Sequence, residues 1–204
     1  MSAPAGTVAG MPTIAIAPAV AGRFSDVEHA LTGGGDGPGC QCQWWMMTNA
    51  DFQRASVDER RERLRVEVED DPVPPGLLAS VDGETAGWVR VGPRTRQVRL
   101  SRTRTYASSH EDWDDDSVWA VSCFVVRKEF RGQGLNAKLL DAAVAFAREH
   151  GARVLEAYPV DPAATKKRTN DLYHGVVSTF RDAGFLEVAR PKPDVAIVAL
   201  DLTV

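Results

Sequence analysis

Two spacings of hydrophobic and polar residues run along this chain and predict its secondary structure. Short apolar runs bounded by Gly, Pro or Asp predict strands, whereas longer segments with apolar residues three and four positions apart predict helices. The run at 118–126 is apolar at nearly every position, which is typical of a strand buried on both faces. We expect strands at 13–17, 76–81, 85–91, 118–126, 153–158, 185–189 and 195–202, and helices at 24–31, 57–69, 136–150 and 176–183.

The order of these elements indicates one mixed α/β domain with a central sheet. Strands come first, a β-α-β-α-β-β series follows, and Asp82-Gly83 is a typical hairpin turn between the second and third strands. The first residues are small and apolar with interspersed prolines and no basic start. We therefore expect a disordered tail at 1–12, not a signal peptide, and a single folded domain at 13–204.

The composition is that of a globular protein and excludes some functions. Of the 204 residues, 44% are hydrophobic and 25% charged, which suffices for a core without disulfides or metals. The formal net charge of −4 gives no overall basic field for nucleic acid or an anionic membrane. No apolar run approaches the roughly 18 residues of a membrane span, so we expect a cytoplasmic protein without a membrane partner.

The cysteines do not predict a disulfide framework or a metal centre. There are three of them, Cys40, Cys42 and Cys123, and only the first two are close in sequence. A structural zinc site needs four ligands, which this spacing does not supply. We expect reduced, mostly buried thiols and no bound metal.

Basic and acidic residues are segregated between the third and fourth predicted strands. Six arginines fall within 90–104, and an acidic run follows at 111–116. We interpret both blocks as one long loop that folds back on itself through Arg–carboxylate pairs. Contact with RNA through the arginines is a weak alternative, because the neighbouring carboxylates would repel phosphate.

The segment after the strand at 118–126 is the strongest indication of chemistry. It reads Arg131-Gly132-Gln133-Gly134-Leu135-Asn136 and opens the helix at 136–150. Glycines let main-chain N–H groups approach an anion closely, and a helix N-terminus adds about half a positive charge. The segment therefore predicts a phosphate or pyrophosphate site. It is neither the dinucleotide fingerprint nor the nucleotide P-loop, because the third Gly and the Lys-Ser/Thr are missing.

Together with the stretch VSTFRDAGF at 177–185, this segment resembles the GNAT superfamily of N-acetyltransferases, and more closely a set of bacterial members with unassigned acceptors. The resemblance covers about 76–202. It implies a mixed, mostly antiparallel central sheet flanked by helices. It also implies an enzyme in which a primary amine, on a small molecule or a protein lysine, attacks acetyl-CoA directly in a ternary complex. We expect a monomer or homodimer.

The resemblance assigns acetyl-CoA, as co-substrate, to particular residues. The main chain of Phe124, Val125 and Val126 would pair with the pantetheine arm. Tyr173, in the loop before the last helix, would contact CoA or the acceptor. The pyrophosphate would lie on the main-chain N–H groups of Arg131, Gly132, Gln133, Gly134, Leu135 and Asn136.

The proton-transfer groups are harder to assign. Many members of the superfamily place a Tyr where this chain has Phe180, which has no proton to give. Glu156 and Tyr158 alternate onto one face of their strand, and we assign them as general base and general acid. The alternative is a module of the same fold that binds acyl-CoA without turnover.

One further segment, CQCQWWMM at 40–47, concentrates thiols, indoles and thioethers after a glycine-rich loop. Such a run is usually a packing surface. It is also suited to line an acceptor pocket or a subunit contact.

Overall fold

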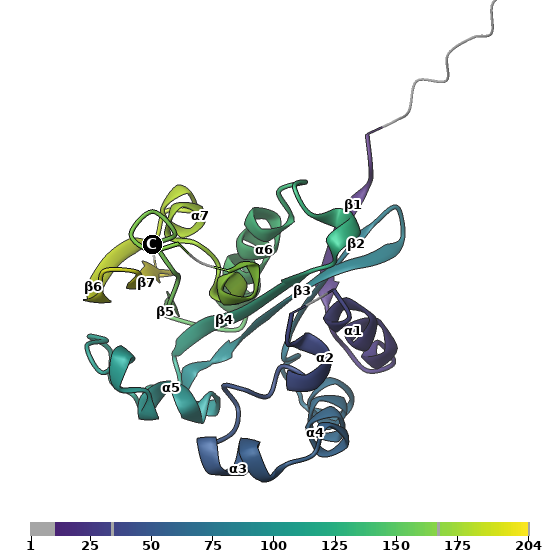
Figure 1. Ribbon diagram of the computed structural model, residues 1–204, viewed down its shortest axis with the longest axis horizontal. Coiled ribbons are helices and arrows are strands. Elements are labelled where there is room, and N and C mark those ends of the chain that lie inside the picture. The colour runs from purple at the N-terminus through teal and green to yellow at the C-terminus, as the bar shows by residue number, and fades with distance from the viewer. Residues whose placement is uncertain (1–10, 34, 167, 204) are drawn as a thin grey trace, which may run out of the picture.

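The computed structural model describes residues 11–33, 35–166 and 168–203, so most of the predicted disordered tail lies outside the described residues. Its centre is a seven-stranded sheet in the order β1-β2-β3-β4-β5-β7-β6 (Figure 1). All neighbours are antiparallel except β4 and β5, which confirms the mixed, mostly antiparallel sheet. The strands are β1 (Ile14–Pro18), β2 (Gly76–Val81), β3 (Glu84–Pro93), β4 (Val118–Val126), β5 (Val154–Ala157), β6 (Leu186–Lys192) and β7 (Val195–Asp201).

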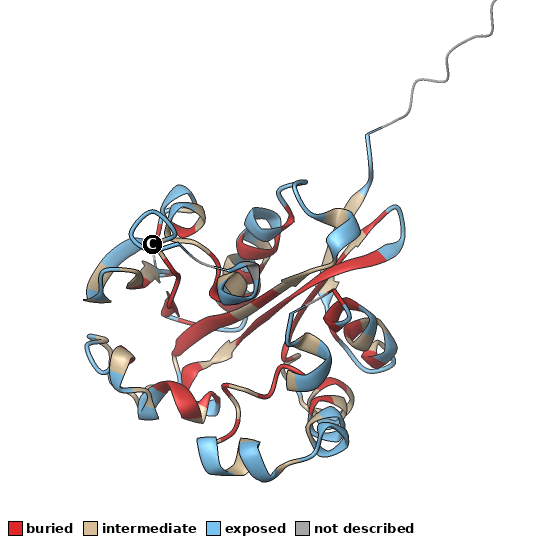
Figure 2. Cartoon of the chain, in the orientation of Figure 1, coloured by how far each residue is buried: buried red, intermediate tan, exposed pale blue. Residues whose placement is uncertain are grey.

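Helices cover both faces of this sheet. One face carries α1 (Phe24–Leu31) and α4 (Val57–Asp70), whose apolar stripes pack on Leu78 and Trp88. The other face carries α6 (Leu135–Glu149) and α7 (Val177–Asp182). Figure 2 shows the buried residues concentrated along the central strands and the helix sides that face them. Two shorter helices, α2 (Gly37–Cys40) and α3 (Asn49–Arg54), flank the CQCQWWMM segment.

Strand β4 is the element that divides the sheet. It pairs with β3 along its length, but with β5 only from Val118 to Val121. Opposite Arg90 and Val91 of β3 stand Cys123 and Val121, so Ser122 is the extra residue of a β-bulge. Because β5 ends at Ala157, no described strand pairs with residues 122–126 of β4 on that side. The second half of β4 therefore has a main-chain edge with no described strand beside it, and side chains reach it at Ser122 and Val126.

The connection between β3 and β4 is not the long loop that the charge pattern predicts. It contains η1 (Arg94–Arg96), α5 (Val98–Arg102) and η2 (Arg104–Tyr106). The prediction is wrong because Arg94 and Arg99 are buried, and their guanidinium groups bind main-chain carbonyls that would otherwise be unsatisfied. The connection does fold back on itself, but it does so through the carbonyls of Glu111 and Asp112.

The remaining short elements lie beside β4. They are η3 (Lys128–Phe130), which leads into the glycine loop, and η4 (Thr169–His174), which ends at Gly175. Among the described residues, no helix has the length and hydrophobicity needed to cross a bilayer.

Gly175 fixes how η4 lies against β4, and its replacement tests this packing. Its φ of 77° and ψ of 176° fall where only glycine is comfortable, and an added Cβ would lie 2.7 Å from the Phe180 ring. We expect Gly175→Ala to lower the free energy of unfolding by about 3 kcal/mol in urea denaturation. Gly151→Ala is the control: it has a φ of 79° but meets no atom within 4 Å, and should cost only about 1 kcal/mol. Equal costs would contradict the close packing at Gly175.

Candidate active site

The loop between β4 and α6 presents its main chain to open space. Gly132 and Gly134 have φ values of +77° and +72°, which other residues rarely adopt. A Cβ built on either would meet no heavy atom within 4 Å. Gly134 is the N-cap of α6, and no side chain of the described residues caps it. The first N–H groups of α6 are thus placed to bind an anion.

The side chain of Arg131 serves the protein itself. Its Nε donates to the carbonyl of Val126 at 3.1 Å, and its Nη2 donates to the carbonyl of Gly33 at 2.9 Å. The guanidinium therefore connects the end of β4 to the segment that follows α1. What Arg131 offers to a ligand is its main-chain N–H.

A cavity of about 890 Å³ opens on this loop. The free half of β4, the loop and the start of α6 form one wall, and Asn170, Leu172 and Tyr173 close one side. Every residue predicted to bind the cofactor lines it except Gln133: these are Phe124, Val125, Val126, Arg131, Gly132, Gly134, Leu135, Asn136 and Tyr173. The cavity thus brings together residues that the sequence places in three separate segments.

The opposite wall of the cavity, which we call the second wall, comes from the N-terminal part of the chain. It includes residues 35–40 and Cys42, together with Trp44 and Trp45 of the CQCQWWMM segment. Phe52 and Arg60 extend this wall, with the Arg60 guanidinium 4.3 Å from the centre of the Phe52 ring. Sequence reasoning suggested the tryptophans but missed Phe52 and Arg60, because no pattern in α3 or α4 connects them to the glycine loop.

Arg99 anchors this second wall, which explains one of the buried arginines. Its guanidinium donates to the carbonyls of Met47 and Thr48 at 3.0 and 2.9 Å and lies 3.8 Å from the centre of the Trp44 ring. These contacts order a segment that has no regular secondary structure. The arginine block is therefore part of the scaffold of the site.

Two buried polar atoms lie where β4 separates from β5. The hydroxyl of Ser122, at the bulge, and Nδ1 of His174 have no hydrogen-bond partner among the described residues. The His174 ring makes a hydrogen bond with the main chain of Ser122. Burial lowers the pKa of His174 to about 3, so the imidazole is neutral at physiological pH. Its free Nδ1 is then an acceptor with an unused lone pair.

Glu156 and Tyr158 contact each other but do not line the cavity. Both are fully buried, and the Tyr158 hydroxyl donates to Glu156 Oε2 at 2.9 Å. Arg94 Nη1 donates to the same oxygen at 2.7 Å, and the Ser109 hydroxyl donates to Oε1 at 2.6 Å. Burial, followed by the charge of Glu156, raises the pKa of Tyr158 well above its usual value. A buried, ionised Glu needs a compensating partner, but no local pattern in the sequence selects Arg94 from the six arginines of 90–104.

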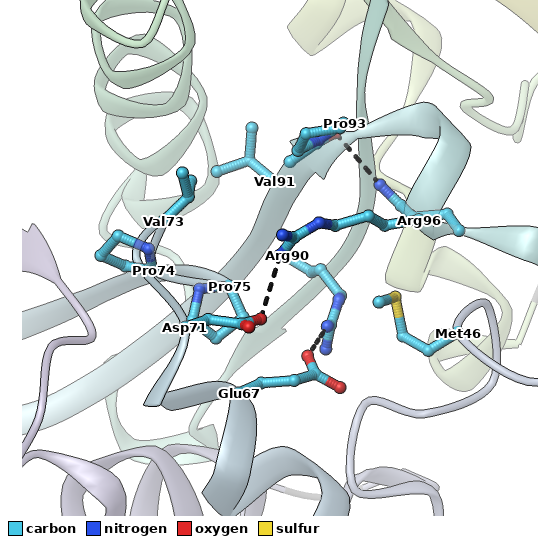
Figure 3. A pocket seen from close by; sticks show the side chains of 12 residues that line it. Met46, Glu67, Asp71, Val73, Pro74, Pro75, Arg90, Val91, Pro93 and Arg96 are labelled. Carbon is cyan, nitrogen blue, oxygen red and sulfur yellow. Dashed lines mark hydrogen bonds and ion pairs between the residues drawn. The ribbon is translucent and has the colours of Figure 1, made fainter. Parts of the chain in front are cut away.

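A separate crevice of about 20 Å³ beside β3 is too small for a cofactor, since it has room for about one water molecule. Figure 3 shows the ion pair of Arg90 with Glu67 there, and that of Arg96 with Asp71. Arg90 is 3% exposed, and its Nη1 also donates to the carbonyl of Cys42 at 3.1 Å. The ion pair thus holds α4 and the second wall against β3.

Comparison with known proteins assigns the family. Residues 41–173 match the acetyltransferase (GNAT) family, and the chain belongs to it. No protein of curated function matches the sequence significantly. The family uses acetyl-CoA, and membership supports acyl transfer as the general chemistry.

Solved structures share the fold at low sequence identity. An N-acetyltransferase from Staphylococcus aureus Mu50 is 14% identical, with a TM-score of 0.54 over 94% of this chain and 99% of that one. A GNAT acetyltransferase from Streptococcus pneumoniae is 16% identical, with a TM-score of 0.52 over 93% and 99%. The ribosomal-protein-S18-alanine N-acetyltransferase from Escherichia coli is 11% identical, with a TM-score of 0.51 over 94% and 96%. These similarities extend over almost the whole of each chain.

The buried Arg94–Glu156 ion pair gives a prediction about stability. Glu156→Gln keeps the shape and the hydrogen-bond acceptor but leaves the Arg94 charge without its counter-charge, and we expect a loss of about 3–5 kcal/mol. In the double variant Arg94→Met/Glu156→Gln no uncompensated charge remains, so part of this loss should be recovered. Urea denaturation at neutral pH measures both. A loss below about 1 kcal/mol in Glu156→Gln would contradict a buried pair.

Proposed function

We propose that the protein is an N-acyltransferase that moves the acetyl group of acetyl-CoA to a primary amine by direct attack in a ternary complex. The observation that carries the proposal is the cavity between the free edge of β4 and the second wall, with the N-terminus of α6 at one of its borders. This site combines an unpaired strand edge with an anion-binding helix end. A pantetheine arm attached to a pyrophosphate has the matching chemistry.

Each wall has a defined role in this proposal. The main chain of Phe124, Val125 and Val126 pairs with the amides of the pantetheine arm, as a further strand would. The pyrophosphate lies against the main chain from Arg131 to Asn136, where Gly132 and Gly134 allow close approach. The Arg131 side chain takes no part, since two carbonyls already hold it.

The amine acceptor, a small molecule or a protein lysine, enters beside Trp44 and Trp45 of the second wall. Its nitrogen attacks the thioester carbonyl, the carbon–sulfur bond breaks, and the CoA thiolate takes up a proton. The enzyme contributes mainly by positioning the two substrates, together with main-chain N–H groups for the developing oxyanion.

Glu156 and Tyr158 are the proposed proton-transfer pair, with Glu156 as base and Tyr158 as acid. They lie directly behind the cavity wall, because Tyr158 packs in one cluster with Trp45 and Tyr173, which line the cavity. Tyr158 is protonated and therefore has a proton to give. Glu156 can accept a proton only after it releases one of its present partners, Arg94, Ser109 or Tyr158.

This occupancy of Glu156, with Phe180 in the place of the usual Tyr, also favours a second candidate function. In that alternative the protein binds acyl-CoA without turnover. The two functions differ in whether any amine releases CoA thiol, which the second experiment below measures.

Binding is tested by thermal unfolding with acetyl-CoA. At a concentration of about 100 Kd, we expect a stabilisation of about 2.7 kcal/mol, which corresponds to a rise in Tm of roughly 5–10 °C. Gly134→Trp should abolish the rise, because the indole fills the space in front of α6. Gly83→Trp is the matched control: its φ is +85°, an added Cβ meets nothing within 4 Å, and it lies in the β2–β3 turn. No rise in the unmodified protein would contradict acyl-CoA binding.

Turnover is tested by a screen of amines and peptides with free-thiol detection. With an acceptor identified, Tyr158→Phe should lower kcat about 100-fold while the rise in Tm with acetyl-CoA persists. Tyr106→Phe is the control, since it removes the same hydroxyl from the ring that stacks on Tyr158 at 4.3 Å. Equal kcat values in the two variants would exclude Tyr158 as the acid. A rise in Tm without thiol release from any acceptor would support the binding module.

A further inference from the structure

Three cysteines line the cavity, and the proposed acyl transfer uses none of them. Cys40 and Cys42 come from the second wall, and Cys123 comes from the free half of β4. All three are reduced. No group of three or more metal-ligating side chains converges anywhere in the described residues, these thiols included.

The sulfur of Cys42 is surrounded by groups that stabilise a thiolate. Trp88 Nε1 donates to it at 3.2 Å, and the thiol of Cys123 donates to it from β4. The guanidinium of Arg90 lies against the same residue, fixed by its ion pair with Glu67 (Figure 3). The hydrogen bond from Cys123 is the largest cause that lowers the pKa of Cys42, to about 6.

The pKa values of Cys123 and Cys40 are raised, whereas that of Cys42 is lowered. The hydrogen bond that Cys123 gives to Cys42 raises the pKa of Cys123 well above its usual value, and burial adds to the effect. Burial raises the pKa of Cys40 as well. The cavity wall therefore holds one thiolate in contact with one protonated thiol, which is the arrangement of an attacking and a resolving cysteine.

The main chain at Cys42, beside the cavity, is strained. Gln41 and Cys42 have φ values of 51° and 53°, and two consecutive non-glycine residues in the left-handed region are rare. Neighbouring contacts hold them there: the Gln41 amide donates to the Pro38 carbonyl at 2.8 Å, and the Gln43 amide donates to Glu67 at 2.7 Å. Strain of this kind is common at functional positions.

We propose that Cys42 and Cys123 form a redox-active dithiol that reacts with low-molecular-weight disulfides entering the cavity. The Cys42 thiolate attacks the disulfide R–S–S–R, forming a mixed disulfide and releasing R–S⁻. The thiol of Cys123 then loses its proton and attacks the Cys42 sulfur, which forms the Cys42–Cys123 disulfide and releases the second R–S⁻. The two cysteines are oxidised and the small disulfide is reduced to two thiols.

The contact between Cys42 and Cys123 affects the two steps of this reaction to different extents. The lowered pKa of Cys42 increases the fraction of its thiolate at neutral pH, but the lower nucleophilicity of such a thiolate offsets most of the gain in rate. The second step benefits more, because the resolving sulfur is already in contact with Cys42 and the reaction is intramolecular. The internal disulfide should therefore replace the mixed adduct.

Mass spectrometry of the intact protein with 4,4′-dithiodipyridine as the probe tests this proposal. We expect the Cys42–Cys123 pair of the unmodified protein to become lighter by about 2 Da and to release two thiopyridones, apart from any adduct on the half-buried Cys40, and dithiothreitol to reverse the change. Cys42→Ser and Cys123→Ser should instead gain about 110 Da as a mixed disulfide on the remaining partner. Cys40→Ser, the matched control from the same wall, should form the same internal disulfide as the unmodified protein.

Two results would overturn the proposal. One is adduct formation on separate cysteines of the unmodified protein with no internal disulfide. The other is an internal disulfide that is lost in Cys40→Ser but kept in Cys42→Ser or Cys123→Ser. Cys42→Ser and Cys123→Ser each test the internal disulfide on their own. If one of them fails to fold, the other still decides the result. The readout does not depend on acetyl-CoA, so its outcome and that of the proposed function are distinguishable.

Discussion

The site depends on one constraint, which is that every buried main-chain N–H and C=O needs a hydrogen-bond partner. Strand β4 meets this requirement on its β3 side throughout, but on its other side only as far as Val121, where β5 ends. Beyond the bulge at Ser122, the edge of β4 faces η4 and the cavity. A fully paired β4 would leave no space for a ligand, so the short length of β5 creates the site.

Buried arginines hold the rest of the site around this edge. Arg90 connects α4 to the CQCQWWMM segment, Arg99 binds the carbonyls of that segment, and Arg94 compensates the charge of Glu156. Each satisfies groups in a stretch with little regular secondary structure. Arginine suits this task because its planar guanidinium reaches several acceptors at once. The net charge of −4 is therefore a poor guide to where the charges act.

The sequence predicted the secondary-structure elements and the glycine loop well, for a physical reason. Hydrophobic periodicity reports local burial, and it placed β2, β4 and α1 at their observed bounds. The spacing of Gly132 and Gly134 encodes a local backbone requirement and is equally readable. Contacts between distant segments have no such local signal. The second wall, the partner of Glu156 and the proximity of Cys42 to Cys123 could therefore not be predicted from the sequence.

The arginine-rich stretch at 90–104 is a case in which the sequence pattern predicts exposed residues and the structure buries some of them. Six arginines in a polar stretch are typical of an exposed loop, yet Arg94 and Arg99 are buried. Periodicity treats a charged residue as a surface residue, because burying a charge is costly without partners. The partners here are the Glu156 carboxylate and the carbonyls of residues 47, 48, 111 and 112, which only the folded chain brings together.

The two bonds of Arg131 have a consequence for the size of the cavity. One bond ends on Val126 in the first wall, and the other on Gly33, next to the segment that forms the second. The distance across this border is therefore set by the span of a single guanidinium. Both acceptors are main-chain carbonyls, which any residue supplies, so differences in cavity width among related proteins should follow the side chain that replaces Arg131, even where Gly132 and Gly134 are unchanged.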